Sequence, residues 1–243
     1  MIDWLREPAV PVAPPVVEVA GAELPLDIRR HPRARRMTLR LAPDGKSARI
    51  TIPRWGRTGE ALAFARSRSA WLASQLAKLP EEKPFDPAAP LLFRGETVPI
   101  KHSSTHIRRP VLLNGSLQCG GPEEGLEKRI VRWLEGEALA LFASDAACFA
   151  DRAGVETPEI RLSRARRRWG SCSATGTLRL NWRLVMAPDE VRRSVVAHEI
   201  AHLVHFDHSP AFHTALAQIF DGDLPAADRW LKERGRTLYA PFG

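Results

Sequence analysis

His198-Glu199-Ile200-Ala201-His202 forms an HExxH pattern, and His208 follows His202 by six residues. Histidines four apart lie on the same face of a helix, so both imidazoles can reach one metal ion. Glu199 points to the side of that face, beside the open position of such an ion, and His208 would add a third ligand from beyond the helix end. Three nitrogens and one water form the open tetrahedral site that is typical of catalytic zinc.

The alternative is a surface helix whose histidines are solvated. The residues around the pattern argue against it, because the segment is apolar on nearly every side, as a buried helix is. These residues are Val195, Val196, Ile200, Ala201, Leu203 and Val204. Buried histidines and a buried carboxylate are costly unless they are paired or bound to a metal. The segment therefore favours a metal site.

Zinc is the default ion for imidazole ligands, although nickel, copper or iron also suit them, and manganese or cobalt could support the same chemistry. A ligand histidine is usually oriented by an acceptor on its second ring nitrogen. Asp207 or Glu190 could supply that acceptor, and Asp207 is the better candidate because Glu190 lies eight residues before His198.

The metal would lower the pKa of its water, and Glu199 would take the proton as that water attacks a substrate. The attacked centre could be a peptide carbonyl, and Glu199 would then return the proton to the departing amine. The same water could attack phosphorus, so hydrolysis of a nucleotide phosphoanhydride is the alternative.

The chain has 243 residues, 44% of them hydrophobic, which allows one large domain or two small ones. No stretch is apolar for long enough to cross a membrane, and the start of the chain lacks the pattern of a secretory signal. Cys119, Cys148 and Cys172 are odd in number and widely spaced, so they predict no disulfide framework. These features favour a cytoplasmic protein, and they leave its oligomeric state open.

The formal net charge is +8, and nearly all of the positive charge comes from arginine. Arginines cluster in residues 29–36 and again in residues 161–168. Guanidinium groups match phosphate oxygens, so a nucleotide or nucleic-acid surface is one interpretation. A solvated basic face is the other, and the absence of interleaved aromatic residues favours it.

The pattern along the chain predicts three segments. Residues 1–21 form a proline-rich, extended tail. Residues 22–120 form a β-rich domain with one helix from 58 to about 79. Its strands are expected at 24–29, 37–41, 48–52, 91–93, 97–101, 111–113 and 116–119, with a hairpin turn at Asp44-Gly45.

Residues 121–243 form the third segment, the HExxH domain. A long helix is expected over 123–153 with Gly154 as its C-cap. Two strands at 160–162 and 177–181 are expected to pair antiparallel beside the metal helix, which Pro188 opens. Two helices, 210–220 and 226–237, close the chain, and Ser209 is the N-cap of the first. The predicted class is α+β, with a mostly helical, zincin-like C-terminal part.

Four motifs in succession resemble the YgjP-like, SprT-related zinc metallopeptidases. Besides the HExxH segment, they are Arg168-Trp169-Gly170-Ser171-Cys172-Ser173, Leu178-Arg179-Leu180-Asn181-Trp182-Arg183-Leu184 and His208-Ser209-Pro210-Ala211-Phe212. The basic strand at 29–36 and the helix carrying Trp71-Leu72 extend the resemblance over about residues 22–238.

The resemblance implies that His198, His202 and His208 bind zinc and that Glu199 is the catalytic base. His205 and His213 remain competitors for the third position. The resemblance also implies that the strand at 178–181 is an edge that can hold an extended polypeptide substrate. SprT-like relatives suggest a third function, proteolysis of DNA-associated proteins.

Four further residues are candidates for the substrate cleft: Arg168, Trp169, Cys172 and Asn181. Each has a structural alternative. Trp169 is expected to pack, as is Trp182, and Cys172 is expected to be a small buried residue in a tight bend. Asn181 could bond either to a substrate or to a neighbouring loop.

Overall fold

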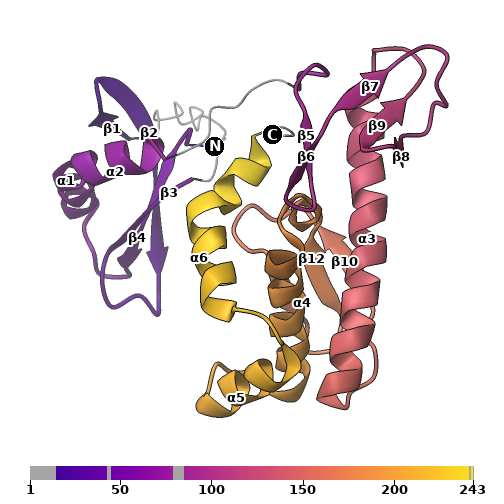
Figure 1. Cartoon of the computed structure of the whole chain (residues 1–243). Coiled ribbons are helices and arrows are strands. Elements are labelled where there is room, and N and C mark those ends of the chain that lie inside the picture. Colours follow the sequence, from indigo (N-terminus) through magenta and orange to yellow (C-terminus); the bar gives the residue numbers. More distant parts are fainter. Residues whose placement is uncertain (1–14, 43–44, 79–84, 241, 243) are drawn as a thin grey trace, which may run out of the picture. The chain divides into compact units, whose positions relative to one another are not determined.

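A computed structural model describes residues 15–42, 45–78, 85–240 and 242 of the chain. The chain divides between Leu79 and Pro80 into two compact units, each with its own hydrophobic core (Figure 1). No helix among the described residues is long and apolar enough to pass through a bilayer.

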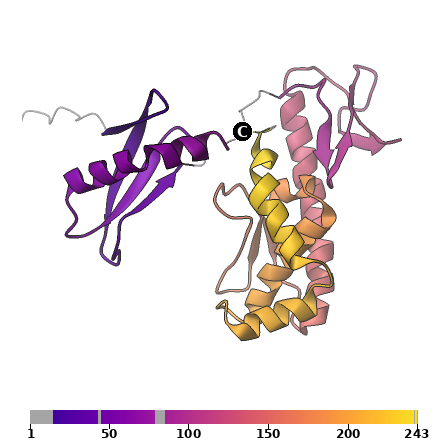
Figure 2. The same cartoon turned by 60° about the vertical axis from the view of Figure 1, so that its left-hand side comes forward.

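The N-terminal unit is a four-stranded sheet covered by helices on one face. Its strands are β1 (Val16–Val19), β2 (Ala22–His31), β3 (Thr38–Leu41) and β4 (Ala48–Pro53), in the order β1-β2-β4-β3. The strands β2 and β4 are parallel, and the other pairs are antiparallel. Alternate residues such as Leu26 and Ile50 point inward because side chains alternate along a strand. The helices α1 (Thr58–Ser67) and α2 (Ser69–Leu76) cover that face (Figure 2).

Two predictions for this unit need correction. Residues 16–19, assigned to the tail, form β1, because the alternation in Val-Val-Glu-Val buries Val17 and Val19 against the core. The single helix is two helices, since the chain turns at Arg68. Residues 1–14 of the tail and Asp44 of the hairpin lie outside the described residues, and α2 ends at Leu76, before the expected end near residue 79. Gly45 has a φ of 69° and joins β3 to its antiparallel neighbour β4.

The C-terminal unit begins with small sheets that pack on a long helix. The hairpin β5 (Leu91–Phe93) and β6 (Glu96–Val98) is followed by a sheet of β7 (Ile100–His102), β9 (Ser116–Cys119) and β8 (Val111–Leu113). Pro99 separates β6 from β7, where one strand was expected at 97–101, because proline has no N–H for a ladder. The helix α3 (Leu126–Ala153) ends at Gly154, which adopts the left-handed conformation expected of a C-cap.

The division at Leu79 differs from the expected boundary between residues 120 and 121. Leu91, Phe93 and Leu117 belong to the same core as α3, so these strands are part of the second unit. The turn of the β5–β6 hairpin also bonds to the segment before the HExxH helix, since Arg94 N–H donates to the Val185 carbonyl at 2.8 Å. Such long-range contacts are not visible as breaks in composition.

The HExxH segment lies in α4 (Asp189–Val204), which packs between α3 and α6 (Leu224–Arg234) (Figure 1). Its buried residues include Val196 and Ile200, so the expectation of a buried helix is confirmed. The helix α5 (Pro210–Ile219) begins where predicted, because the Ser209 hydroxyl accepts a bond from the Phe212 N–H. Two 3₁₀ helices, η1 (Trp182–Met186) and η2 (Gly235–Tyr239), complete the unit.

A three-stranded sheet lies beside α4, in the order β10 (Ile160–Ser163), β12 (Leu178–Asn181) and β11 (Gly170–Cys172). The α+β class is confirmed, but the sheet is mixed rather than antiparallel. The strands β10 and β12 are parallel, because β11 forms the hairpin with β12 and β10 takes the other side. The edge strand toward α4 is therefore β11, and β12 is central, which corrects the edge expected at 178–181.

Candidate metal centre and active site

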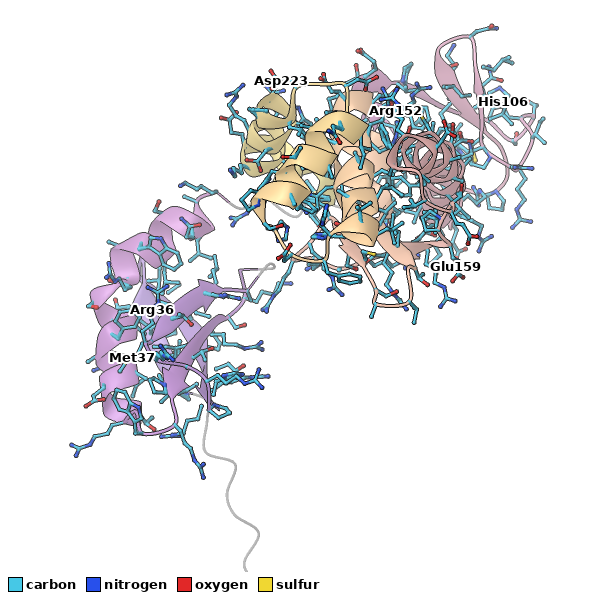
Figure 3. The ribbon with its side chains drawn as sticks, turned by 90° about the horizontal axis from the view of Figure 1, so that it is seen from below. Arg36, Met37, His106, Arg152, Glu159 and Asp223 are labelled. Atoms are coloured by element: carbon cyan, nitrogen blue, oxygen red, sulfur yellow. The ribbon has the colours of Figure 1, made fainter. Side chains whose placement is uncertain are left out.

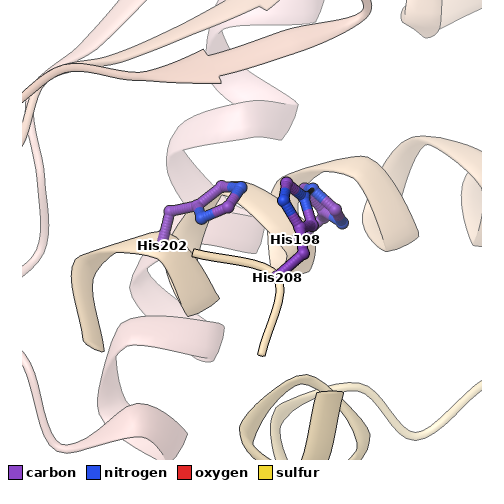
Figure 4. Close-up of side chains that lie close together, drawn as sticks. All are labelled: His198, His202 and His208. Carbon is purple, nitrogen blue, oxygen red and sulfur yellow. Dashed lines mark hydrogen bonds between the residues drawn. The ribbon is translucent and has the colours of Figure 1, made fainter. Parts of the chain in front are cut away.

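Three imidazoles converge at the end of α4. One ring nitrogen each from His198, His202 and His208 lies within 4.8 Å of the other two. The rings of His198 and His202 come from successive turns of α4, and His208 joins them from the loop before α5 (Figure 4). Among the described residues, this is the one group of three or more candidate ligands that meets at a point, so His205 and His213 are not part of it.

The spacing of these nitrogens suits a tetrahedral ion. Zinc–nitrogen bonds of about 2.0–2.1 Å at tetrahedral angles place two ligand nitrogens roughly 3.3 Å apart. Nε2 of His208 lies 3.2 Å from Nε2 of His198. Three neutral imidazoles with a free fourth position are a ligand set of the kind found in catalytic zinc sites. The residues present therefore fit zinc.

A backbone carbonyl orients His202. Its Nδ1 lies 3.1 Å from the His205 carbonyl oxygen, which leaves Nε2 for the metal. Neither acidic residue proposed for this role contacts a ligand histidine. Asp207 accepts from the Ser209 N–H, and Glu190 accepts from the Asp223 N–H at 2.9 Å. The Asp207 carboxylate thus closes a local turn, and the Glu190 carboxylate ties α4 to the residue before α6.

The environment keeps His198 neutral. Burial lowers its pKa to about 4, and the neighbouring imidazoles of His202, His208 and His213 act in the same direction. Neutral imidazole is the form that binds metal. The ring of Phe212 lies within 5.0 Å of each of the three candidate ligand rings and closes the apolar side of the group.

Glu199 is buried next to this group, with 6% of its surface exposed. Burial raises the pKa of its carboxyl to about 7, while a hydrogen bond from the backbone N–H of Cys172 and the charge of Arg168 oppose that shift. The carboxylate is thus fixed to β11 by a main-chain donor. A carboxyl that titrates near neutral pH is suited to accept and return a proton.

The contact between β11 and α4 depends on a residue without a side chain. A Cβ at Gly170 would lie 2.4 Å from Oε1 of Glu199 and 2.6 Å from its Cγ. The φ of Gly170 is not in the left-handed region, so glycine is required here for space and not for backbone conformation. The Trp-Gly-Ser-Cys motif therefore brings the strand close enough for the Cys172 N–H to reach Glu199.

The family model for the YgjP-like metallopeptidase domain matches residues 35–234. This chain belongs to the YgjP-like metallopeptidase family. That membership confirms the resemblance and supports a metal-dependent peptidase. Among solved structures, the crystal structure of the metallopeptidase zymogen of Pyrococcus abyssi abylysin shares 22% identity, covers 39% of this chain and 96% of that one, and has a TM-score of 0.36. No curated protein matches the chain.

The four cleft candidates have different places in the YgjP-like chain. Arg168 is exposed and acts on Glu199 through its charge, and Cys172 is half-buried on β11. Burial, followed by the charge of Glu199, raises the pKa of the Cys172 thiol. Trp169 packs against Tyr239 with ring centroids 5.6 Å apart, so the expected packing role is confirmed.

Asn181 has no exposed surface that a substrate could contact. It is fully buried, and its Nδ2 donates to the Ala165 carbonyl at 2.8 Å and lies 3.0 Å from the Tyr239 hydroxyl. Its Oδ1 accepts from the Arg183 N–H at 3.1 Å. The side chain thus ties η1 to the loop before β11. The sequence allowed Asn181 to bond either to a substrate or to a neighbouring loop, and in the structure it bonds to the loop.

Sequence reasoning did not identify three groups that shape the site. They are the Cys172 N–H, the His205 carbonyl and the absent side chain of Gly170. The first two are main-chain groups that carry no residue signature. The glycine inside Arg168–Ser173 was a visible signal, because a glycine in a strand often marks a close approach of another group.

Proposed function

We propose that this chain is a zinc-dependent metallopeptidase in which His198, His202 and His208 hold the ion and Glu199 is the general base. The convergence of three imidazole nitrogens within 4.8 Å, next to a buried carboxylate, carries this proposal. The family membership supports the peptidase class, and the 3.2 Å spacing supports a tetrahedral ion.

When bound, zinc supplies Lewis-acid chemistry, which lowers the pKa of a water and polarises a carbonyl. Glu199 takes the proton of the attacking water on its carboxylate and delivers it to the departing amine nitrogen. The Cys172 N–H holds that carboxylate in position, and burial keeps its pKa in the range where both transfers are feasible. Phe212 excludes water from the inner side of the imidazoles.

An extended peptide would bind along β11. Trp169 O accepts from Asn181 N and Ser173 N donates to Thr177 O, so the peptide groups of Gly170 and Cys172 point away from β12. The Cys172 N–H is used by Glu199. The N–H and carbonyl of Gly170 and the carbonyl of Cys172 then face the open edge, where a substrate strand can bond to them.

The phosphoanhydride alternative has weaker support. Two of the arginines in residues 161–168 are engaged in ion pairs within the unit, since Arg161 pairs with Glu159 at 2.8 Å and Arg164 pairs with Glu135 at 2.6 Å. A peptide needs no such cluster. We therefore assign polypeptide as the substrate class.

Cleavage of an unstructured polypeptide by zinc-loaded protein tests the proposal. Wild type is expected to release new amino termini, and Glu199→Gln, which keeps the shape of the side chain without its basicity, is expected to lose at least about 100-fold in kcat. Equal cleavage by the variant, or phosphate release from nucleotides without peptide cleavage, would contradict it.

A further inference from the structure

The net positive charge of the chain lies almost entirely in its N-terminal unit. Residues 1–79 carry 14 lysines and arginines against 7 acidic residues, whereas residues 80–243 carry 22 against 21. Twelve of those 14 are arginines. The three imidazoles and Glu199 belong to the other unit.

The topology gathers many of these arginines at one end of the sheet. The strands β2 and β4 are parallel, so their carboxyl ends meet, and β3 starts from the same end because it runs antiparallel to β4. The two loops at this end carry the residues that we call the arginine rim: Arg33, Arg35, Arg36, Arg54, Trp55 and Arg57. All six are exposed, and Arg36 is labelled in Figure 3.

Trp55 stands out within the arginine rim. It follows Arg54 directly and is 76% exposed, although burying a tryptophan is strongly favourable. Its loop is held in place, because the Arg30 guanidinium donates to the Thr58 hydroxyl at 3.0 Å and to the Gly56 carbonyl at 3.5 Å. A fixed loop thus presents an aromatic face to solvent between guanidinium groups.

The acidic groups of the unit do little to neutralise the arginine rim. Glu60 accepts from the backbone N–H of Arg57, and Glu18 and Glu23 lie on β1 and at the start of β2, away from this end. Four guanidiniums of the arginine rim form no ion pair within residues 15–42 and 45–78. These belong to Arg33, Arg35, Arg36 and Arg54.

The face of the sheet opposite α1 and α2 continues the basic surface. Asp27 is shared by Arg29 at 3.0 Å and Arg49 at 2.7 Å. Arg40 stands directly opposite Arg49 across the β3–β4 pair. Like charges in this relationship lower the stability of a sheet, so the arrangement favours an anion supplied from outside.

We propose that the arginine rim binds single-stranded nucleic acid, with guanidiniums on successive phosphates and Trp55 stacked on a base. Stacking requires an unpaired base, and arginine forks match phosphate oxygens better than lysine does. A membrane surface is disfavoured, because bilayer binding uses a broad apolar face and the rim has a single aromatic side chain. This inference is independent of the proposed peptidase activity.

Fluorescence anisotropy of labelled 20-nucleotide strands with the full chain tests the proposal. Binding to oligo-dT or oligo-U is expected at 50 mM salt, and it should weaken steeply as salt rises. The Arg33→Gln/Arg35→Gln/Arg36→Gln variant is expected to lose at least about tenfold in affinity and to reduce the salt slope by about 2. Trp55→Ala is expected to lose about tenfold.

The matched control removes the same charge from the helical side of the unit, as Arg66→Gln/Arg68→Gln/Lys78→Gln. It is expected to keep most of the affinity. Comparing DNA with RNA strands identifies the preferred sugar, and either one supports the proposal. Equal losses in both triple variants, no binding at about 50 µM protein, or binding to phosphatidylserine vesicles but not to oligonucleotides would overturn it. Circular dichroism verifies that each variant is folded.

Discussion

Gly170 on β11 and Glu199 on α4 are in contact so close that a Cβ at position 170 would lie 2.4 Å from Oε1 of the carboxylate. The strand can therefore approach the helix only because residue 170 has no side chain. Because the strand lies this close to the helix, the backbone N–H of Cys172, two residues further along β11, donates to the same carboxylate. The strand that would receive the substrate thus also positions the proposed base.

Gly170→Ala is expected to reduce kcat by about 100-fold, because displacing a catalytic group by roughly 1 Å has an effect of that size. The three atoms nearest to this Cβ position all belong to Glu199 and none to an imidazole, so zinc content is expected to stay at the wild-type value. Peptidase kinetics and elemental analysis of the same sample measure both quantities.

The matched control for that variant is Gly136→Ala. Gly136 is exposed on α3, and a Cβ there meets no atom within 4 Å. This change should leave kcat unaltered and raise stability by about 0.5–1 kcal/mol, since alanine is the better helix former. If Gly170→Ala were as active as this control, the proposed positioning of Glu199 by β11 would be wrong.

Asn181→Ala is expected to lower the free energy of unfolding by about 1–3 kcal/mol, because it leaves the buried Arg183 N–H without its acceptor, while the Ala165 carbonyl loses one donor and keeps the Tyr239 hydroxyl. The KM of the folded fraction should change little, since the Asn181 side chain is fully buried. Urea denaturation and peptidase kinetics together measure the two effects. A large rise in KM with unchanged stability would instead restore Asn181 as a substrate contact.

The three cysteines are expected to differ in their rates of alkylation at pH 7.5. Cys148 is exposed and should react with iodoacetamide first, whereas Cys119 is fully buried and should react last. Burial raises the pKa of the Cys172 thiol, so little of the reactive thiolate is present at this pH. Its rate should therefore increase when the pH is raised further. Peptide mapping by mass spectrometry measures each site, and rapid labelling of Cys172 at pH 7.5 would contradict the expectation.

Asp189, at the start of α4, is expected to stabilise the fold only while it is ionised. Burial alone would raise its pKa, but the hydrogen bond from Arg94 and the charge of Arg192 together lower it below the ordinary value of an aspartate. A depressed folded-state pKa gives stability that is present above the unfolded-state pKa, about 3.9, and is lost as pH falls through the folded value.

Thermal unfolding of wild type and Asp189→Asn measures this contribution. The melting temperature of the variant should be lower by a constant amount between pH 5 and pH 7, and the difference should shrink below about pH 4. A difference that is the same at pH 3 and pH 7 would show that the charge of Asp189 plays no part.

Local signals in the sequence predicted much of the C-terminal unit. The i, i+4 spacing of His198 and His202 requires one helical face, and the caps at Ser209 and Gly154 are set by neighbouring residues. Each of these features depends on a few consecutive residues. The structure confirms these local features, since contacts with distant residues do not override them.

Features that depend on distant partners were not predictable in the same way. The pairing of β10 with β12 is decided by which side of β12 the β11 hairpin occupies, and the burial of Asn181 depends on Tyr239, 58 residues away. The boundary at Leu79 depends on the packing of β5 and β6 against η1 and α3. The alternation of apolar residues and the propensity of each residue for helix or strand do not predict strand pairing, long-range burial or the boundary between units.

The zinc content of the purified full chain and of His208→Ala, measured by elemental analysis after dialysis against about 1 µM free zinc, tests the central claim most directly. The account predicts one zinc per wild-type chain and loss of most of it in the variant, because two imidazoles cannot fill a tetrahedral site. His205→Ala should retain its zinc, since its ring lies outside the converging group. Wild type without zinc, or His208→Ala that retains a full equivalent, would contradict the proposed metal centre.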